Sequence, residues 1–88
     1  MRKIQINYDL SAPGRNYTAV EAYIKSFRRW NHLLESTWVV ETTKTAASVR
    51  DEMKGVVDSN DRVVVFDVTH SDWATNFSDE RTTWLKAA

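Results

Sequence analysis

Asp9 is the residue of this sequence that most directly suggests chemistry. It closes an alternating stretch, Lys3–Leu10 (KIQINYDL), and a Ser-Ala-Pro-Gly turn sequence follows. A carboxylate there offers the hard oxygen that Mg²⁺ or Mn²⁺ prefers, and such an ion activates water for attack on phosphorus. The same carboxylate could instead accept hydrogen bonds from backbone N–H groups of the turn. Because one carboxylate is few ligands, the metal interpretation requires a symmetric dimer that doubles it.

Other polar residues give weaker signals. Asp67, His70 and Asp72 form a D-x-x-H-x-D pattern that fits no established metal site, and a solvated strand end is the simpler interpretation. His32 has no predictable acid–base partner. The serines and threonines lack a paired base, and the two glycines form no phosphate-binding loop. The absence of cysteine excludes disulfides and thiolate zinc sites.

Charge is distributed unevenly, although the formal net charge of the 88 residues is zero. Residues 1–30 hold six basic and two acidic side chains, and the remaining residues hold six basic and ten acidic ones. Zero net charge argues against strong, indiscriminate binding to DNA or membranes. The asymmetry indicates either a mixed surface or a basic patch that contacts phosphate or an acidic partner. The candidate nucleic-acid contacts of such a patch are Arg2, Lys3, Arg15, Arg28 and Arg29.

Apolar residues recur every three or four positions from residue 16 to 30 and predict an amphipathic helix there. The stripe consists of Tyr17, Val20, Ile24 and Phe27, widened by Ala19, Tyr23 and Trp30. Asn16, or Thr18 with Glu21, is expected to cap this helix. Arg28 and Arg29 fall in its expected last turn, where the helix dipole favours cations.

The remaining elements alternate strand and helix. His32–Thr43 is predicted as sheet, with a bulge or bend near Ser36 that joins two short strands. Thr43–Val57 is predicted as a second helix with an apolar stripe, a threonine cap at position 43 or 45, and Gly55 near its end. Arg62–Thr69 is the most hydrophobic strand and is expected at the centre of the sheet. A short helix is expected from Ser78 or Asp79 to about residue 86.

This order predicts an α+β, ferredoxin-like βαββαβ fold with a short C-terminal helical tail. We expect one domain over residues 1–88, with a core of about 3–69 and a tail of 70–88, and both main helices on one face of the sheet. The bare second face favours a homodimer. We expect the tail aromatics Trp73, Phe77 and Trp84 at an interface.

With no apolar run of roughly 20 residues and no signal peptide, the sequence predicts a cytoplasmic protein.

Four stretches resemble a known group of proteins: INYDLSAPGRNY, WNHLLESTWVVET, the alanine- and valine-containing helix that ends in RDEM, and SNDRVVVFDVT. They look like the SinR-type small proteins, which are similar to CRISPR-associated protein two, the smaller CRISPR adaptation protein, and more distantly to virulence-associated protein D. The resemblance covers roughly residues 3–69. It implies a ferredoxin-like homodimer in which Asp9 of both subunits binds a divalent metal for phosphodiester cleavage. The family's serine-x-aromatic falls on Ser36 and Trp38, with tryptophan in place of the usual phenylalanine, and we expect both residues at an interface.

Two classes of function follow from the sequence. The leading hypothesis is a nucleic-acid-binding dimer or a metal-dependent endonuclease acting on RNA or DNA, with Asp9 as the catalytic residue and ligand of Mg²⁺ or Mn²⁺. The alternative is a non-catalytic protein–protein interaction module in defence, counter-defence or toxin regulation, for which the zero net charge, the few candidate ligands and the aromatic tail argue. A toxin-like ribonuclease in the manner of virulence-associated protein D is a third hypothesis.

Overall fold

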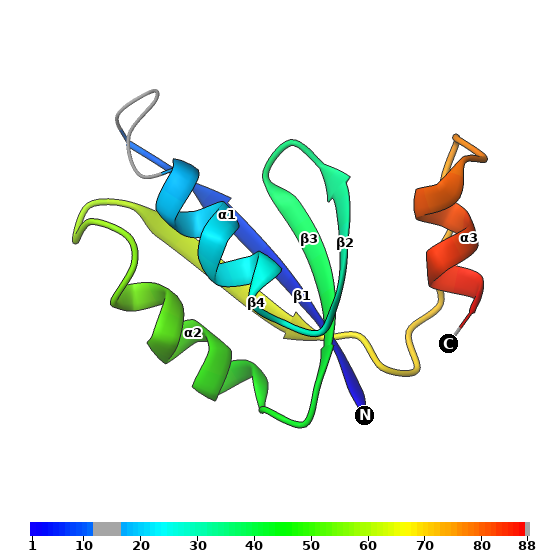
Figure 1. Cartoon of the computed structure of the whole chain (residues 1–88), viewed down its shortest axis with the longest axis horizontal. Coiled ribbons are helices and arrows are strands. Elements are labelled where there is room, and N and C mark those ends of the chain that lie inside the picture. Colours follow the sequence, from blue (N-terminus) through cyan, green and yellow to red (C-terminus); the bar gives the residue numbers. More distant parts are fainter. Residues whose placement is uncertain (12–16, 88) are drawn as a thin grey trace.

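The structure is a computed structural model, and it describes residues 1–11 and 17–87. Its elements in chain order are β1 (Arg2–Asp9), α1 (Tyr17–Lys25), β2 (Arg29–Leu34), β3 (Thr37–Thr42), α2 (Ala46–Lys54), β4 (Arg62–Asp67) and α3 (Glu80–Lys86). The strands form one antiparallel sheet in the order β2-β3-β1-β4 (Figure 1). The predicted α+β class is therefore confirmed, with four antiparallel strands and three helices among the described residues.

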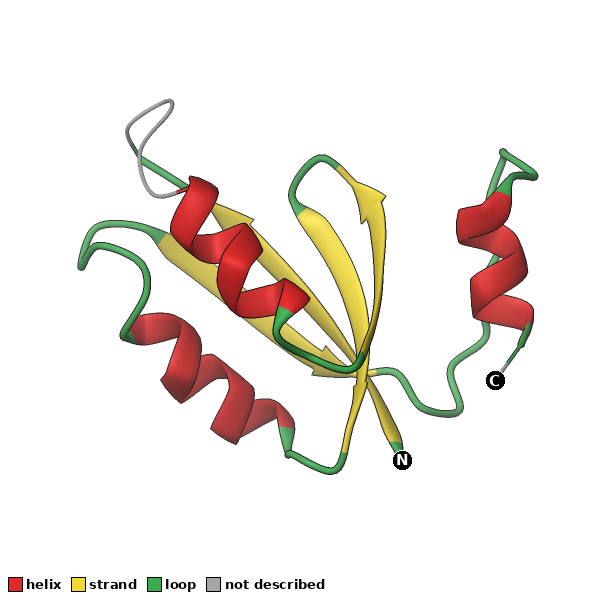
Figure 2. Ribbon diagram, in the orientation of Figure 1, coloured by secondary structure: helices red, strands yellow, loops and turns green. Residues whose placement is uncertain are grey.

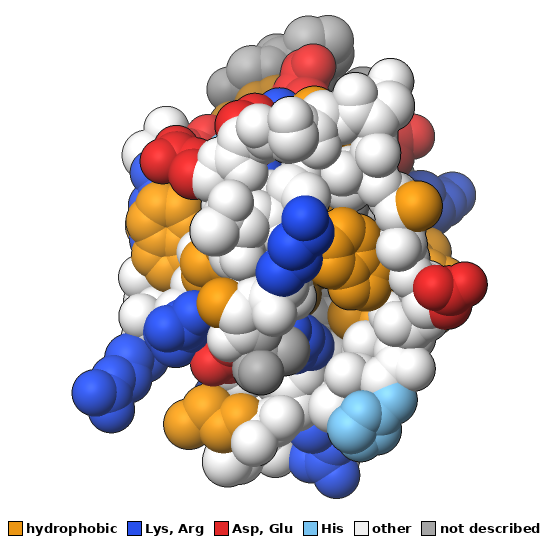
Figure 3. Space-filling view, turned by 90° about the vertical axis from the view of Figure 1, so that its right-hand side faces the viewer, with side chains coloured by type: hydrophobic (Ala, Val, Ile, Leu, Met, Phe, Trp, Pro, Cys, Tyr) orange, Lys and Arg blue, Asp and Glu red, His pale blue; other side chains and the backbone are white. Residues whose placement is uncertain are grey.

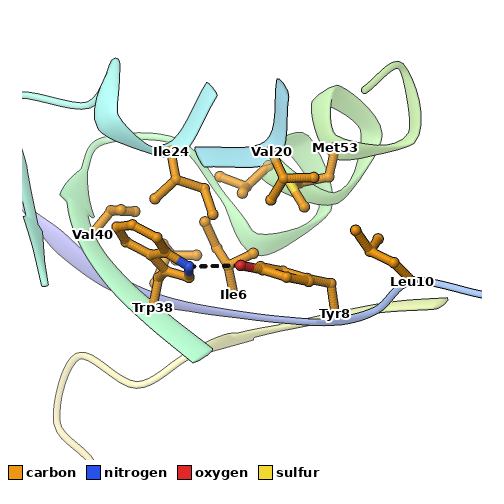
Figure 4. Packing of buried hydrophobic residues seen from close by; sticks show 10 residues of the cluster. Ile6, Tyr8, Leu10, Val20, Ile24, Trp38, Val40 and Met53 are labelled. Carbon is orange, nitrogen blue, oxygen red and sulfur yellow. Dashed lines mark hydrogen bonds between the residues drawn. The ribbon is translucent and has the colours of Figure 1, made fainter. Parts of the chain in front are cut away.

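The alternation in β1 separates the two faces of the sheet. Ile4, Ile6 and Tyr8 point to one face, and α1 and α2 cover it (Figure 2). Val20 and Ile24 of α1 pack against these strand residues in the main core (Figure 4). The remaining buried members of this core are Leu10, Trp38, Val40, Val49 and Met53. We refer to the opposite side of the sheet, which carries the odd-numbered residues of β1, as the second face.

The helix α1 ends earlier than the apolar spacing predicts. It stops at Lys25, where the Ser26 N–H donates to the Tyr23 carbonyl at 3.1 Å and the next N–H donates three residues back in the same way. Arg29 and Trp30 already belong to β2, so the prediction that the arginines lie in a helical last turn is wrong. Trp30 falls at a helical interval in the sequence although it lies in a strand, because the strand also presents it to the main core. Its ring centroid lies 5.5 Å from that of Trp38.

The helix α2 begins where its cap predicts. The Thr45 hydroxyl accepts a hydrogen bond from the Ser48 N–H at 3.1 Å, which selects Thr45 from the two predicted caps. Gly55 follows the last helical residue, as expected. Tyr23 of α1 donates its hydroxyl to Glu52 of α2 at 2.6 Å, so the two helices are tied together. A hydrogen bond from Lys44, followed by that from Tyr23, holds the pKa of Glu52 below its usual range.

The strand β4 lies at an edge of the sheet, so the prediction that it is central is wrong. The central strands are β1 and β3. The run is apolar on both faces for two different reasons: Val63 and Val65 pack on the main core, while Val64 and Phe66 are half-exposed on the second face. The apolar residues on both faces of β4 therefore do not reflect a central position in the sheet.

The tail covers part of the second face, which was expected to be bare. The helix α3 lies on the β2 side of the sheet (Figure 2) and contacts β2. Its Leu85 forms a small cluster with Leu33 and Val39. Asp79 caps α3 by accepting a hydrogen bond from the Arg81 N–H at 3.0 Å, in agreement with the prediction for this helix. Among the described residues, no helix has the length and apolar character needed to cross a bilayer.

Candidate functional site

Asp9 lies at the end of β1 with its backbone opposite Arg62 of β4. Its odd position in β1 places it on the second face, and its side chain is exposed. Within residues 1–11 and 17–87, no hydrogen bond or ion pair engages the Asp9 carboxylate. An accessible carboxylate without a structural role in the described part of the chain is chemically suited to bind a cation.

The carboxylate that holds the turn after β1 belongs to Asp61. It accepts hydrogen bonds from the Ser11 N–H at 2.8 Å, from the Ser11 hydroxyl at 3.1 Å and from the Asp58 N–H at 2.8 Å. Asp61 therefore joins the end of β1 to the turn before β4. The capping role that the sequence offered to Asp9 is filled by Asp61 for Ser11, and the rest of the turn sequence, with Asn16, lies outside the described residues.

Replacing Asp61 with alanine is expected to lower the free energy of unfolding by about 1–3 kcal/mol, because two backbone N–H groups lose their acceptor. The matched variant Asp9→Ala is expected to change it by less than about 0.5 kcal/mol, as exposed substitutions usually do. Urea denaturation followed by circular dichroism measures both. A loss for Asp9→Ala as large as that for Asp61→Ala would show that Asp9 is structural.

The predicted basic contacts gather at the opposite end of the sheet from Asp9. Arg2 and Lys3 begin β1, and Arg28 and Arg29 lie where β2 begins. Since β1 has eight residues, about 24 Å of strand separates its two ends. One chain therefore does not bring Asp9 and these cations together, and Arg15 lies outside the described residues.

Most of these cations are already engaged. Arg2 lies 3.4 Å from Asp67, and Arg29 lies 3.2 Å from Glu41. Lys3 donates to the Leu85 carbonyl at 3.2 Å. Arg28 is exposed and has no ion pair or hydrogen bond within the described ranges. The charge available for phosphate is therefore smaller than the sequence count suggests.

Ser36 and Trp38 both form hydrogen bonds with Tyr8, near the end of β1. The Ser36 carbonyl accepts the Tyr8 N–H at 3.2 Å, and the Trp38 Nε1–H donates to the Tyr8 hydroxyl at 2.9 Å (Figure 4). Trp38 is fully buried and its ring stacks on His32 at 3.7 Å between centroids. Burial raises the pKa of Tyr8. The side chain of Trp38 is thus part of the monomer core and does not reach an outer surface.

The D-x-x-H-x-D pattern does not assemble into a ligand cluster. Asp67 accepts hydrogen bonds from the hydroxyl and the N–H of Thr69, and the hydroxyl bond is the main reason that the pKa of Asp67 lies below its usual range. Across the part of the chain that the structure describes, no three His, Cys, Asp or Glu side chains are grouped to hold a metal ion.

The second face carries Val64 and Phe66, which the sequence did not assign to a site, and the tail aromatics, which it placed at an interface. Val64 and Phe66 are 50% and 53% exposed on β4, and Trp73 in the tail is 40% exposed. A cavity of about 290 Å³ lies between the sheet and the tail, with Leu85 and Trp73 among its walls. Phe77 and Trp84 are half-buried against the small cluster on this face. The sequence signal that could have identified this apolar surface was the run RVVVFDVT, which is apolar on both faces of the strand.

Comparison of the chain with protein-family models, with curated proteins and with solved structures gives no match.

Proposed function

We propose that this chain acts on nucleic acid as a homodimer, in the manner of CRISPR-associated protein two, and that Asp9 of both copies binds Mg²⁺ or Mn²⁺ for phosphodiester cleavage. One observation carries the proposal. Asp9 lies on the same face of the sheet as the half-exposed apolar side chains Val64 and Phe66. A dimer that buries this strip would bring two copies of Asp9 toward a common interface.

The chain order supports a ferredoxin-like assignment. The helix α1 connects β1 to β2, the helix α2 connects β3 to β4, and both cover the same face of a sheet with the order β2-β3-β1-β4. In this arrangement β1 is central and its Asp9 end adjoins the edge strand β4. A residue at that position is close to any partner that pairs through β4.

The edge strand β4 has features that favour a second copy as partner. It contains no proline or lysine, which are common devices that prevent edge pairing, and Val64 and Phe66 on its second face are apolar and half-exposed. A twofold interface presents the same strip twice, so an apolar surface is complementary to itself. We therefore assign the homodimer to the β4 side of the second face.

The ligands available fit a divalent cation only as a pair. A single Asp9 offers two oxygens, whereas Mg²⁺ takes six ligands and keeps several waters when carboxylates are few. Two Asp9 carboxylates with water would meet this need. A cation held there would supply an activated water and stabilise charge on the phosphate, while the Asp9 pair would fix its position.

Asp9→Ala is expected to abolish Mn²⁺ binding at the dimer and to reduce cleavage at least a hundredfold, because each dimer loses both carboxylates. Calorimetric titration with Mn²⁺ and cleavage assays on single-stranded RNA and duplex DNA measure this. Asp72→Ala removes an exposed carboxylate of the tail and serves as control. Unchanged cleavage in Asp9→Ala would overturn the role of Asp9, and absence of binding and cleavage in the wild type would overturn the proposed function.

A non-catalytic interaction module is the second candidate, and one observation favours it. Trp73, which is 40% exposed, lines the cavity between the sheet and the tail together with apolar residues of both. A protein partner that docks there would need no metal. Recovery of one stoichiometric protein partner without nucleic acid, lost in Trp73→Ala, would favour this candidate over the nuclease.

A further inference from the structure

A hollow of about 320 Å³ lies between the edge strand β2 and the helix α3, away from Asp9. Two tryptophans line it, one from each element. Its described lining consists of Trp30, Asn31, His32, Glu80, Arg81 and Trp84. Figure 3 looks onto the α3 side of the molecule, where Lys and Arg, hydrophobic, and Asp and Glu side chains are interspersed.

Cations lie over the rings of both tryptophans. The Lys25 ammonium is 5.3 Å from the Trp30 ring centroid. The Arg29 guanidinium and the Lys3 ammonium are 5.4 and 5.7 Å from the Trp84 ring centroid. Aromatic rings with adjacent cations are the surface on which single-stranded nucleic acids stack their bases while the backbone meets positive charge.

Both walls of the hollow are held in place before any ligand arrives. The Trp30 ring packs against the ring of the buried Trp38, and Trp30 remains 38% exposed. Asn31 is buried and donates its side-chain amide to the Arg81 carbonyl at 3.0 Å, which ties β2 to α3. The Arg81 guanidinium donates to the Leu33 carbonyl at 2.7 Å. A preformed platform loses little conformational freedom when a base stacks on it.

Of the described cations near the hollow, Arg29 pairs with Glu41 and Arg81 pairs with Asp79, which leaves Arg28 and Lys25 for a polyanion. Arg28, which lies beside this end of the sheet, is exposed and unpaired within the described ranges. Lys25 contacts Glu21 only at 3.7 Å, with both side chains largely exposed. Exposed pairs of this kind contribute little energy, so a phosphate can compete for the lysine. Glu80 is the one acidic side chain in the described lining.

We propose that this hollow binds single-stranded nucleic acid, with bases stacked on Trp30 and Trp84 and phosphates near Arg28 and Lys25. The site shares its class of partner with the proposed function but requires neither the metal nor the dimer. It also differs from duplex binding, because a base reaches a ring in a hollow only when it is free of its complementary strand.

Labelled decathymidylate and decauridylate, titrated at low salt with a metal chelator present, test the proposal by fluorescence anisotropy. Trp30→Ala is expected to weaken binding about five- to a hundredfold, the range for loss of one stacking platform. Trp30→Phe retains a ring and is expected to remain within about fivefold of wild type. Trp73→Ala is the matched control, because Trp73 is exposed to a similar degree, 40%, and lies outside this hollow.

Arg28→Ala is expected to reduce the slope of log affinity against log salt by about 0.7, the value for one phosphate contact on a single strand. Equal binding by Trp30→Ala and wild type, or no binding of either oligonucleotide by wild type, would overturn the proposal. Binding that Asp9→Ala loses and Trp30→Ala retains would place the nucleic-acid contact at the Asp9 end of the sheet and overturn this proposal. Binding that Trp30→Ala loses and Asp9→Ala retains would support this site whether or not the nuclease proposal survives.

Discussion

Trp38→Ala is expected to lower the free energy of unfolding by about 3–5 kcal/mol, the usual cost of truncating a buried tryptophan. Trp38 is fully buried, packs in the main core and stacks on His32. Its Nε1–H also meets the Tyr8 hydroxyl at 2.9 Å. A domain of this size has roughly 5–15 kcal/mol of stability in total, so the variant should unfold at a much lower urea concentration. Circular dichroism follows the transition without relying on tryptophan emission.

Two controls separate packing from hydrogen bonding. Tyr8→Phe removes the acceptor and leaves the Trp38 N–H buried without a partner, which is expected to cost about 1–3 kcal/mol. Trp73→Ala removes a half-exposed ring of the same type and is expected to change stability by less than about 1 kcal/mol. If Trp38→Ala cost no more than Trp73→Ala, the placement of Trp38 at the centre of the core would be wrong.

Phe66→Asp is expected to raise the dissociation constant of the proposed homodimer at least a hundredfold. A twofold interface that buries the apolar strip of β4 would receive two unpaired carboxylates, and desolvating a charge without a partner costs several kcal/mol. The monomer should remain folded because Phe66 is 53% exposed within one chain. Sedimentation velocity over a range of protein concentrations measures the dissociation constant.

Leu34→Asp is the matched control for this variant. Leu34 is 56% exposed but lies on β2, at the opposite edge of the sheet from β4. The same substitution there should leave the dimer intact. If Leu34→Asp dissociates the dimer and Phe66→Asp does not, the interface lies on the other edge. In that case the two Asp9 carboxylates would not meet, and the metal proposal would lose its second ligand.

Features set by neighbouring residues were predicted well from the sequence. The Thr45 cap of α2 and the cap of α3 at Asp79 depend on a side chain and an N–H only two or three residues apart. The strand character of β1 follows from its alternation. A bulge or bend joining two short strands was expected near Ser36, and a turn at Glu35 and Ser36 joins β2 to β3, with a register shift between His32 and Leu34.

Features set by distant contacts were not predictable in this way. Trp30 fits the apolar spacing of α1 but lies in β2, because a helix and a strand can present residues to the same core. The edge position of β4 depends on which strands pair, and periodicity does not contain that information.

In the candidate site, too, features set by neighbouring residues were predictable and features set by distant contacts were not. Asp9 was identified from its place at the end of a strand, and the structure leaves it exposed and uncommitted within the described residues. The carboxylate that holds Ser11 comes from Asp61, far along the chain, so no local pattern could distinguish the two aspartates. The hollow between Trp30 and Trp84 likewise joins a strand and a helix separated by most of the sequence.

The central place of β1 has a consequence for biosynthesis. The strand β1 leaves the ribosome before the other three strands of the sheet and pairs on one side with β3 and on the other with β4, so that Ile4 lies opposite Asp67. Until β4 has emerged, β1 keeps one edge open and Ile6 lacks part of its cover. Contacts so distant in sequence form slowly because the loop between them must first close. The nascent chain therefore completes its sheet only after β4 has emerged, and the apolar strand β1 depends until then on the β2–β3 hairpin for protection.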